Sequence, residues 1–599
     1  MSIRERTGGD DGEAKHITED AESRIAFMQS PHVKPAGRPR VLIIGLDGAP
    51  PALVERLAAA GVMPNCARLL REGAFGILRS TPNYNSFSAW CSFMTGVNPG
   101  KHGIFNFLNR ISGTYDLRRV HSGMRQVPSV FQILSDARKS VISLNVPSTY
   151  PAEEVRGLVV ADWMTPSVRS EGFTYPAELA AELLAATGGE YHLHTEVRKP
   201  ALSRRYDQAF RNLADSFRSR LAAAEFCLRR VDWDVAAVVF TETDAANHYF
   251  SHFDRDHPQH DCRAFDKYGD VLAGAYAEAD AVIGRLLAHV DENTTVVILS
   301  DHGSCPESRG KAFTRGILEA IGALTPRRGG ALSPVKSLRS AAARAGKRSF
   351  EALNRMLPRG LKMRLDERFR GLSHRMIAGS FIFDVDWAHT TAYCYYWDTD
   401  PYVNLQGREP HGIVPPAEYN AVRDGIAEQL LAARDAATGR PVVKHVLRCE
   451  DAYHGPCADS SPDLIVWWDD TGPIERIRLG DSADGTPDAL PSTTLWDVVT
   501  GGHHPDGTVI LWGRGVRPGC SLTGANIMDI APTTLHLLGE PVPTNMDGKV
   551  LTDALVAGLA EVRHSAGAEA GVAEAAPDEG YSDEELELVE KRLRNLGYL

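Results

Sequence analysis

Short apolar runs alternate with amphipathic stretches along most of the chain. Seven runs, rich in β-branched residues, have the length of strands and are apolar at consecutive positions: 41–46, 141–146, 157–162, 236–240, 295–300, 463–468 and 508–513. Consecutive apolar positions are typical of strands buried on both faces, as in parallel sheets covered by helices. Amphipathic spacing predicts helices at 52–60, 65–72, 204–230, 275–289 and 528–538. We therefore predict an α/β fold with a large, mostly parallel central sheet covered by helices on both faces.

The two ends of the chain and one internal segment depart from this pattern. Residues 1–38 are polar and rich in Gly, Asp and Glu, which predicts a disordered leader. We predict an α/β domain at 39–323 and 381–556, interrupted by a helical insertion at 324–380. A linker with a C-terminal amphipathic helix follows at 557–599. Residues 327–375 of the insertion carry fourteen Lys and Arg against three Asp and Glu. This segment is either a solvated helical face or a lid for an anionic substrate.

Composition excludes several classes of function. The 599 residues are 43% hydrophobic and 24% charged, and the net charge is −12. An acidic protein has no global attraction to duplex nucleic acid or to an anionic membrane, so we expect neither as a partner. The first residues hold no apolar run of signal-peptide length, and no run approaches the about 20 residues of a membrane span. Nine cysteines form no CxxC pair. We expect a soluble, cytoplasmic protein with reduced thiols and no thiolate zinc site, of unknown oligomeric state.

Acids and histidines follow three of the predicted strands. These residues are Asp47, Asp244 with His248 four positions later, and the adjacent pair Asp301 and His302. Taken singly, each acid is also explained as the cap of a following helix. Together, three such groups at the carboxyl ends of parallel strands meet at one edge of the sheet, where ligands bind. Carboxylates and imidazoles without thiolates are typical ligands of a catalytic divalent metal site.

A segment rich in hydroxyl groups supplies the candidate nucleophile. Residues 81–107 read TPNYNSFSAWCSFMTGVNPGKHGIFNF. The stretch NSFSAWCSFMTGVNPGKHGI resembles the nucleophile segment of the type I phosphodiesterase/nucleotide pyrophosphatase family, within the alkaline phosphatase superfamily. In that family a Thr or Ser opens a helix nine residues before the Thr of a TG pair, and a PxxHGI turn follows; here the TG pair is Thr95–Gly96. The resemblance implies that Ser86 is the nucleophile, with Ser88 and Ser92 as alternatives.

Physical chemistry agrees with that assignment. A hydroxyl at a helix N-terminus lies beside free backbone N–H groups and the positive end of the helix dipole, which favour a phosphate group. A metal ion bound to the Ser86 hydroxyl would lower its pKa enough to form an alkoxide near neutral pH.

The resemblance covers much of residues 40–550 and implies two metal sites with an alkaline phosphatase-like fold. One ion would be held by Asp47, Asp301 and His302 and would also bind Ser86. The other would be held by Asp244, His248 and a later histidine in TGGHHPDG. The implied cofactors are two divalent ions, zinc first, with manganese or magnesium as alternatives.

Two adjacent histidines compete for the last ligand position. The family pattern places a His after Gly, which favours His503 over His504. Neighbouring side chains of an extended segment point to opposite sides, so one ion cannot readily take both. Gly502 frees the backbone before His503, whereas Pro505 restricts His504, which we expect to face the pocket mouth or solvent. Asn106 resembles the family's donor to a phosphoryl oxygen, although its spacing from the HG pair is one residue shorter than usual.

Two later stretches resemble a microbial branch of predicted phosphohydrolases in this superfamily. They are YVNLQGREPHGIV at 402–414 and DIAPTTLHLLGEPVPTNMDGKVL at 529–551. Within the first, Arg408 either clamps a phosphate or forms a salt bridge inside the domain. The NMDG loop of the second is expected to be structural.

These features predict a phosphohydrolase of the phosphodiesterase or nucleotide pyrophosphatase type, acting on a small phosphate ester through a covalent intermediate on Ser86. Phosphomonoesterase, phosphonate hydrolase and phospho-group transferase activities would use the same site and stay open. A sulfatase is disfavoured because the local cysteine lies in CSFMTG rather than in a CxPxR segment. An inactive binding scaffold is the alternative of another class, and it is disfavoured because every expected ligand position holds a competent ligand.

Overall fold

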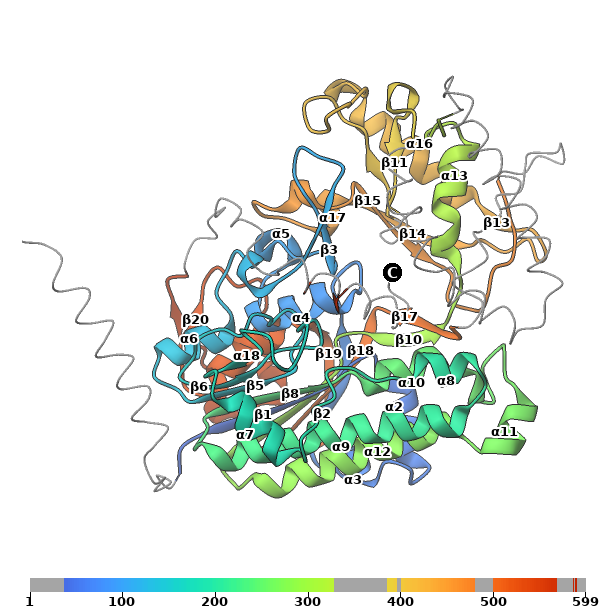
Figure 1. Ribbon diagram of the computed structural model, residues 1–599. Coiled ribbons are helices and arrows are strands. Elements are labelled where there is room, and N and C mark those ends of the chain that lie inside the picture. Colours follow the sequence, from blue (N-terminus) through green and yellow to red (C-terminus); the bar gives the residue numbers. More distant parts are fainter. Residues whose placement is uncertain are drawn as a thin grey trace, which may run out of the picture.

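The computed structural model describes residues 37–327, 385–395, 400–479 and 499–567, together with Glu585, Leu588 and Val589. Nearly all of the predicted leader and of the basic insertion, and most of the predicted C-terminal helix, lie outside the described residues. The described residues form a sheet domain with a smaller lobe above it (Figure 1).

A nine-stranded sheet is the centre of the larger domain. In spatial order its strands are β19 (Cys520–Asn526), β2 (Ala74–Arg79), β18 (Asp506–Gly513), β9 (Thr294–Leu299), β1 (Arg40–Leu46), β8 (Val235–Phe240), β5 (Val141–Leu144), β6 (Gly157–Val160) and β7 (Thr174–Tyr175). The strands from β9 to β6 are parallel, while β18 runs antiparallel to both of its neighbours and β7 runs antiparallel to β6. The predicted large, mostly parallel sheet is confirmed.

Helices cover both faces of this sheet (Figure 1). One face packs on α2 (Pro51–Ala59), α3 (Pro64–Glu72), α9 (Tyr206–Arg230) and α12 (Val271–Leu286). The other packs on α4 (Ser86–Thr95), α6 (Val130–Asp136) and α18 (Ile530–Leu537). Along β1, Leu42 and Ile44 belong to the first core, and Val41 and Ile43 belong to the second. Burial on both faces explains why the strand is apolar at consecutive positions. The five predicted helices are present, with ends shifted by a few residues.

Some strand predictions were wrong or incomplete. The run 463–468 is not part of the central sheet, because β15 (Leu464–Trp468) pairs antiparallel with β14 (Val443–Arg448) in the smaller lobe. The run 508–513 lies in the central sheet as β18, but antiparallel. The strands β2 and β19 were not predicted. Exposed positions alternate with buried ones in β2, and β19 is largely polar, so neither has a continuous apolar run.

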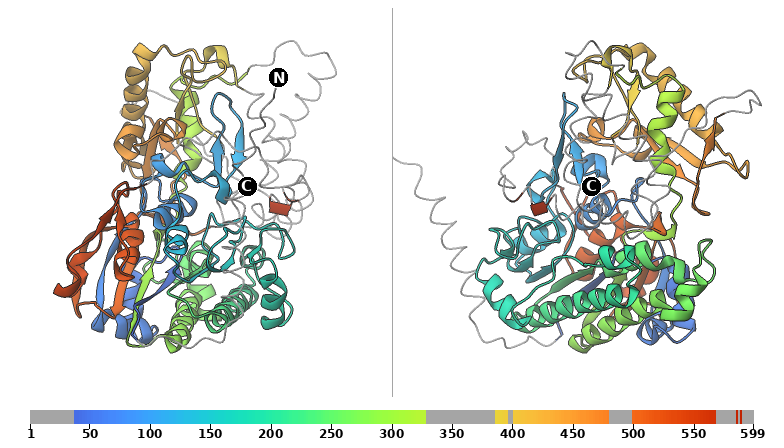
Figure 2. Two further views of the ribbon diagram at one scale, coloured as in Figure 1. Left: turned by 90° about the vertical axis from the view of Figure 1, so that its left-hand side faces the viewer. Right: turned by 45° about the vertical axis from the view of Figure 1, so that its right-hand side comes forward.

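The smaller lobe, called the second lobe below, stands over the carboxyl ends of the parallel strands (Figures 1 and 2). Its core includes side chains of α13 (Thr314–Ala320), α16 (Tyr419–Ala432), β14 and β15. Tyr115, in the loop between β3 (Leu108–Arg110) and β4 (Leu117–Arg119), joins the same core. This hairpin follows the nucleophile segment and ties it to the second lobe.

Arg408 and the NMDG loop have structural partners. The guanidinium of Arg408 donates two hydrogen bonds to Asp463, at 2.7 and 2.6 Å, which matches the salt-bridge alternative. In the NMDG loop, Asp547 accepts a hydrogen bond from the backbone N–H of Asn98 (2.9 Å) and pairs with Lys101. This loop therefore braces the turn that follows the nucleophile helix.

All nine cysteines are free. Among the described residues, no helix combines the length and the apolar character needed to cross a bilayer.

Candidate metal centre and nucleophile

Three neighbouring parallel strands carry the acids of the site. Asp301, Asp47 and Asp244 come after β9, β1 and β8, which lie side by side in the sheet. Their carboxyl ends meet at one edge, so the three carboxylates converge. Asp244 lies in the first turn of α10 (Glu242–Phe250), and His248 lies one turn later on the same face. His248 Nε2 is 3.3 Å from Asp244 Oδ2, as the four-residue spacing predicted.

A short ribbon brings the later histidine to the same edge. The strand β17 (Gly501–His504) pairs antiparallel with β10 (Gly303–Pro306). His503 Nε2 lies 3.2 Å from His248 Nε2 and 3.6 Å from Asp244 Oδ1. We call Asp244, His248 and His503 the Asp244 group; their ligand atoms all lie within 4.8 Å of one another.

His504 points to the other side of the ribbon. Its Nε2 lies 3.5 Å from Asp470 Oδ2 in the second lobe, and its side chain is 32% exposed. The contact with the second lobe was not foreseen from the sequence.

A second group of ligands is more deeply buried. Asp47, Asp301 and His302, the Asp47 group, also have ligand atoms within 4.8 Å of one another. His302 Nε2 is 3.5 Å from both Asp47 Oδ1 and Asp301 Oδ2. Asp301 Oδ2 is buried and has no hydrogen-bond partner among the described residues. A buried carboxylate oxygen without a donor is costly, and a cation would satisfy it.

Ser86 is the hydroxyl that the fold brings to these groups. Its Oγ lies 3.1 Å from His302 Nε2 and 3.5 Å from Asp47 Oδ1. The residue opens α4, where the Asn85 side chain caps the helix by accepting from the backbone N–H of Phe87 (3.0 Å). Of the alternatives, Ser92 uses its hydroxyl in a contact with His102 Nε2 (2.9 Å). The Ser88 hydroxyl is buried and makes no hydrogen bond within the described part of the chain.

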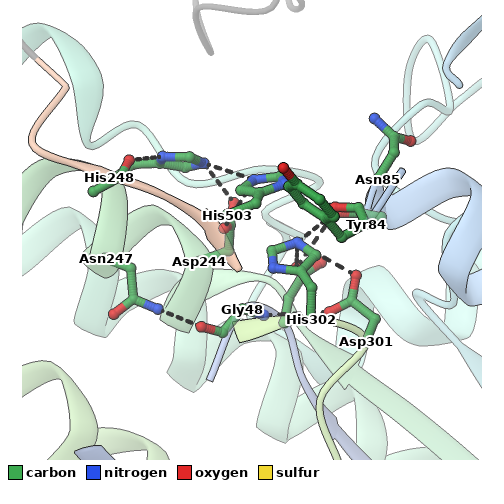
Figure 3. A network of polar contacts seen from close by, with 12 residues as sticks. Gly48, Tyr84, Asn85, Asp244, Asn247, His248, Asp301, His302 and His503 are labelled. Carbon is green, nitrogen blue, oxygen red and sulfur yellow. Dashed lines mark hydrogen bonds and ion pairs between the residues drawn. The ribbon is translucent and has the colours of Figure 1, made fainter. Parts of the chain in front are cut away.

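Backbone carbonyls fix the tautomer of all three histidines in the two groups. The Nδ1 of His248 lies 2.7 Å from Gly501 O, that of His302 lies 2.9 Å from Gly303 O, and that of His503 lies 3.2 Å from Tyr84 O. A carbonyl can only accept, so each Nδ1 carries the proton and each Nε2 lone pair faces the site (Figure 3). Metal-binding histidines are typically oriented in this way.

Two of these lone pairs face each other. With both rings neutral, His248 Nε2 and His503 Nε2 would repel across their 3.2 Å separation. A cation or a proton between them removes the repulsion. The donors of the two groups therefore fit divalent metal ions.

The buried acids have strongly shifted pKa values. Burial, together with the charges of Asp301 and Asp244, raises the pKa of Asp47 well above its usual range. Burial, reinforced by Asp244, raises the pKa of Asp301 to about 7. Burial also opposes ionisation of Asp244, but the His248 ring outweighs it and lowers the pKa of that carboxyl. Burial disfavours the charged form of His248, yet Asp244 prevails and raises the pKa of that ring to about 9. The ionised carboxylates of Asp47 and Asp301 are therefore unfavourable in this buried site on their own, and bound cations would stabilise them.

Asn106 lies against the cap of the nucleophile helix. Its side-chain oxygen accepts hydrogen bonds from Asn85 Nδ2 (3.0 Å) and from the backbone N–H of Phe107 (2.8 Å). Because both bonds use the oxygen, the amide N–H groups of Asn106 are left as donors.

Three supporting residues were not predicted from the sequence. Tyr84 has a φ of 35°, unusual for a residue with a side chain, and this bend presents its carbonyl to His503. Asn247 donates to Gly48 O (2.6 Å), and Thr243 donates to Asp47 O (2.6 Å). Both hold the turn after β1, and Figure 3 shows Asn247 and Gly48 below the histidines. In the sequence, only the adjacency of Thr243 to Asp244 and of Asn247 to His248 could have indicated these two residues.

Comparisons with known proteins give one family match. The model of the type I phosphodiesterase / nucleotide pyrophosphatase family matches residues 41–472. Among curated proteins, no sequence matches significantly. A solved structure of phosphonoacetate hydrolase from Sinorhizobium meliloti 1021, in complex with phosphonoformate, has a TM-score of 0.47 and 14% identity, covering 84% of this chain and 96% of that chain. Murine ectonucleotide pyrophosphatase/phosphodiesterase 5 has a TM-score of 0.41 and 10% identity, covering 85% and 97%. The family match spans most of the chain and includes the nucleophile segment and all three acids, so the chain belongs to the type I phosphodiesterase / nucleotide pyrophosphatase family.

Proposed function

We propose that this chain hydrolyses phosphate esters with Ser86 as the nucleophile and two divalent cations, zinc being the best fit to the donors. The observation that carries the proposal is the convergence of three carboxylates and three Nε2 lone pairs beside the Ser86 hydroxyl. Family membership supports phosphodiester or nucleotide pyrophosphate bonds as the type of bond that is cleaved.

The two ligand groups would each hold one cation. The Asp47 group lies next to Ser86 Oγ. The Asp244 group lies beside the Asp47 group, because the rings of His503 and His302 stack with their centroids 3.8 Å apart. Three protein ligands in each group leave coordination positions for the substrate. When bound, the cations would lower the pKa of the Ser86 hydroxyl and neutralise charge on the phosphoryl group.

The chain's own residues then carry the reaction. Ser86 Oγ attacks phosphorus, the bond to the leaving oxygen breaks, and the phosphoryl group stays on the serine. Water attacks this phosphoseryl group, which breaks the bond to Oγ and restores Ser86. The amide N–H groups of Asn106 and backbone N–H groups at the start of α4 would donate to the non-bridging oxygens, which the acceptor role of the Asn106 oxygen supports.

A substrate comparison tests the proposal. We expect the zinc-loaded protein to hydrolyse 4-nitrophenyl phosphodiesters faster than the matching monoester, phosphonate monoester or sulfate. Release of nitrophenolate measures each rate. Faster cleavage of the monoester or phosphonate would reassign the substrate class, and a loaded protein that turns over none of them would support a binding scaffold instead.

The adjacent histidines should behave differently on substitution. We expect His503→Ala to lose about one metal ion per chain and most of its activity, because the Nε2 of His503 completes the Asp244 group. His504→Ala should keep both ions, because His504 contacts Asp470 and Asp506 instead. Metal analysis of both purified variants measures the difference. The reverse pattern would show that His504 is the ligand.

A further inference from the structure

One cation beside the candidate active site has no part in the proposed mechanism. Lys311 lies in the 3-10 turn Gly310–Phe313, where the chain enters the second lobe, and its side chain is exposed. Its ammonium group lies 5.7 Å from the centroid of the Tyr84 ring. Tyr84 precedes Ser86 by two residues, and its carbonyl holds His503. Figure 3 shows Tyr84 beside His503 and His302.

The backbone around Lys311 is held firmly. A Cβ added to Gly310 would lie 2.3 Å from an indole carbon of Trp468, so this glycine packs directly on that ring. Phe313 is fully buried in the core of the second lobe. Ser308 O accepts a hydrogen bond from the backbone N–H of Ile474 (2.8 Å). The exposed side chain of Lys311 is therefore anchored near the nucleophile rather than on a loose loop.

The ammonium group of Lys311 also has no counter-ion in the part of the chain that the structure describes. Two other cations on this side of the site are paired: Lys444 with Asp470, and Arg79 with Asp506. The acid nearest to it in sequence, Glu307, uses Oε1 to accept from the backbone N–H of Arg309 (2.7 Å). An unpaired ammonium group in an acidic protein attracts an anion.

We propose that Lys311 binds a second anionic group of the substrate, a carboxylate or a phosphate, while the scissile phosphoryl group lies at Ser86. This inference rests on the proposed function and narrows it. The substrate would be a phosphate or phosphonate ester with a further negative charge. The face of the Tyr84 ring attracts the ammonium group of Lys311 and so lowers the cost of ordering this side chain.

Competitive inhibition of ethyl 4-nitrophenyl phosphate hydrolysis tests the inference. The inhibitors are propylphosphonate, with no second anion, 3-phosphonopropionate, with a carboxylate, and propane-1,3-bisphosphonate, with a second phosphonate. We expect at least one doubly anionic inhibitor to have a Ki roughly 10-fold or more below that of propylphosphonate. Which one gains shows whether the second group is a carboxylate or resembles a phosphate. Lys311→Met should abolish the advantage, and Lys311→Arg should retain most of it.

For each variant, the Ki values of a doubly anionic inhibitor and of propylphosphonate are compared as a ratio. A change in the turnover rate of the variant does not affect this ratio. The matched control is Lys267→Met, because Lys267 also lies over a tyrosine ring, that of Tyr268 at 4.6 Å, on the separate helix α11 (Cys262–Tyr268). It should keep the wild-type ratio. Equal Ki values in the wild type, or an advantage that survives in Lys311→Met, would overturn the inference and leave the proposed function intact. If the zinc-loaded protein does not hydrolyse the ester at all, the proposed function fails, and this inference fails with it.

Discussion

Ser86→Ala is expected to lower kcat/KM by roughly three orders of magnitude or more, because the substitution removes the atom that attacks phosphorus. The hydroxyl lies beside the Asp47 group without completing either ligand group. The variant should therefore keep its fold and most of its bound metal. Rates with a 4-nitrophenyl diester, metal analysis and a thermal unfolding curve measure these three properties.

Ser88→Ala is the matched control for this experiment. Ser88 lies in the same helix, and its buried hydroxyl makes no hydrogen bond in the described part of the chain. Its removal should leave the rate and the metal content unchanged. Near wild-type activity in Ser86→Ala, with a large loss in Ser88→Ala or Ser92→Ala, would move the nucleophile and overturn the assignment of Ser86.

Removal of the metal ions should abolish activity and lower the stability of the fold. We expect the purified protein to contain about two divalent ions, and a chelator to stop turnover until zinc is returned. Ions that bind only the folded state stabilise it by mass action, so the chelated protein should unfold at a lower temperature. The structure gives a reason for this loss of stability: without cations, burial and repulsion by neighbouring carboxylates disfavour the ionised forms of Asp47 and Asp301.

Single substitutions should separate the two sites. Asp301→Asn should lose about one ion from the Asp47 group, and Asp244→Asn should lose about one ion from the Asp244 group. Both variants should also lose most of their activity. Asp256→Asn serves as the control, because Asp256 is 87% exposed and pairs with Arg56 on the surface. Full metal content and activity in both site variants would contradict the two-group interpretation.

The sequence by itself located most of the candidate site. An acid that follows a buried apolar run within a few residues lies near the carboxyl end of a strand, and the carboxyl ends of parallel strands meet at one edge of the sheet. Asp47, Asp244 and Asp301 follow this rule, and their strands are neighbours in the sheet. The spacing from Asp244 to His248 placed both on one face of α10. The choice of Ser86 among several hydroxyls came from a resemblance, and the structure places its Oγ beside His302.

Strand direction and pairing were decided only by the tertiary structure. Apolar runs report burial but not the partner that buries them, so the run in β15 looked like a strand of the central sheet and belongs to the second lobe. Unlike the three acids, His503 lies just before a strand of the central sheet, in β17 ahead of β18. It reaches the site because β18 runs antiparallel to β9 and therefore begins at the edge where β9 ends. The carbonyl of Tyr84 and the position of Lys311 depend on long-range packing, which no local pattern of residues encodes.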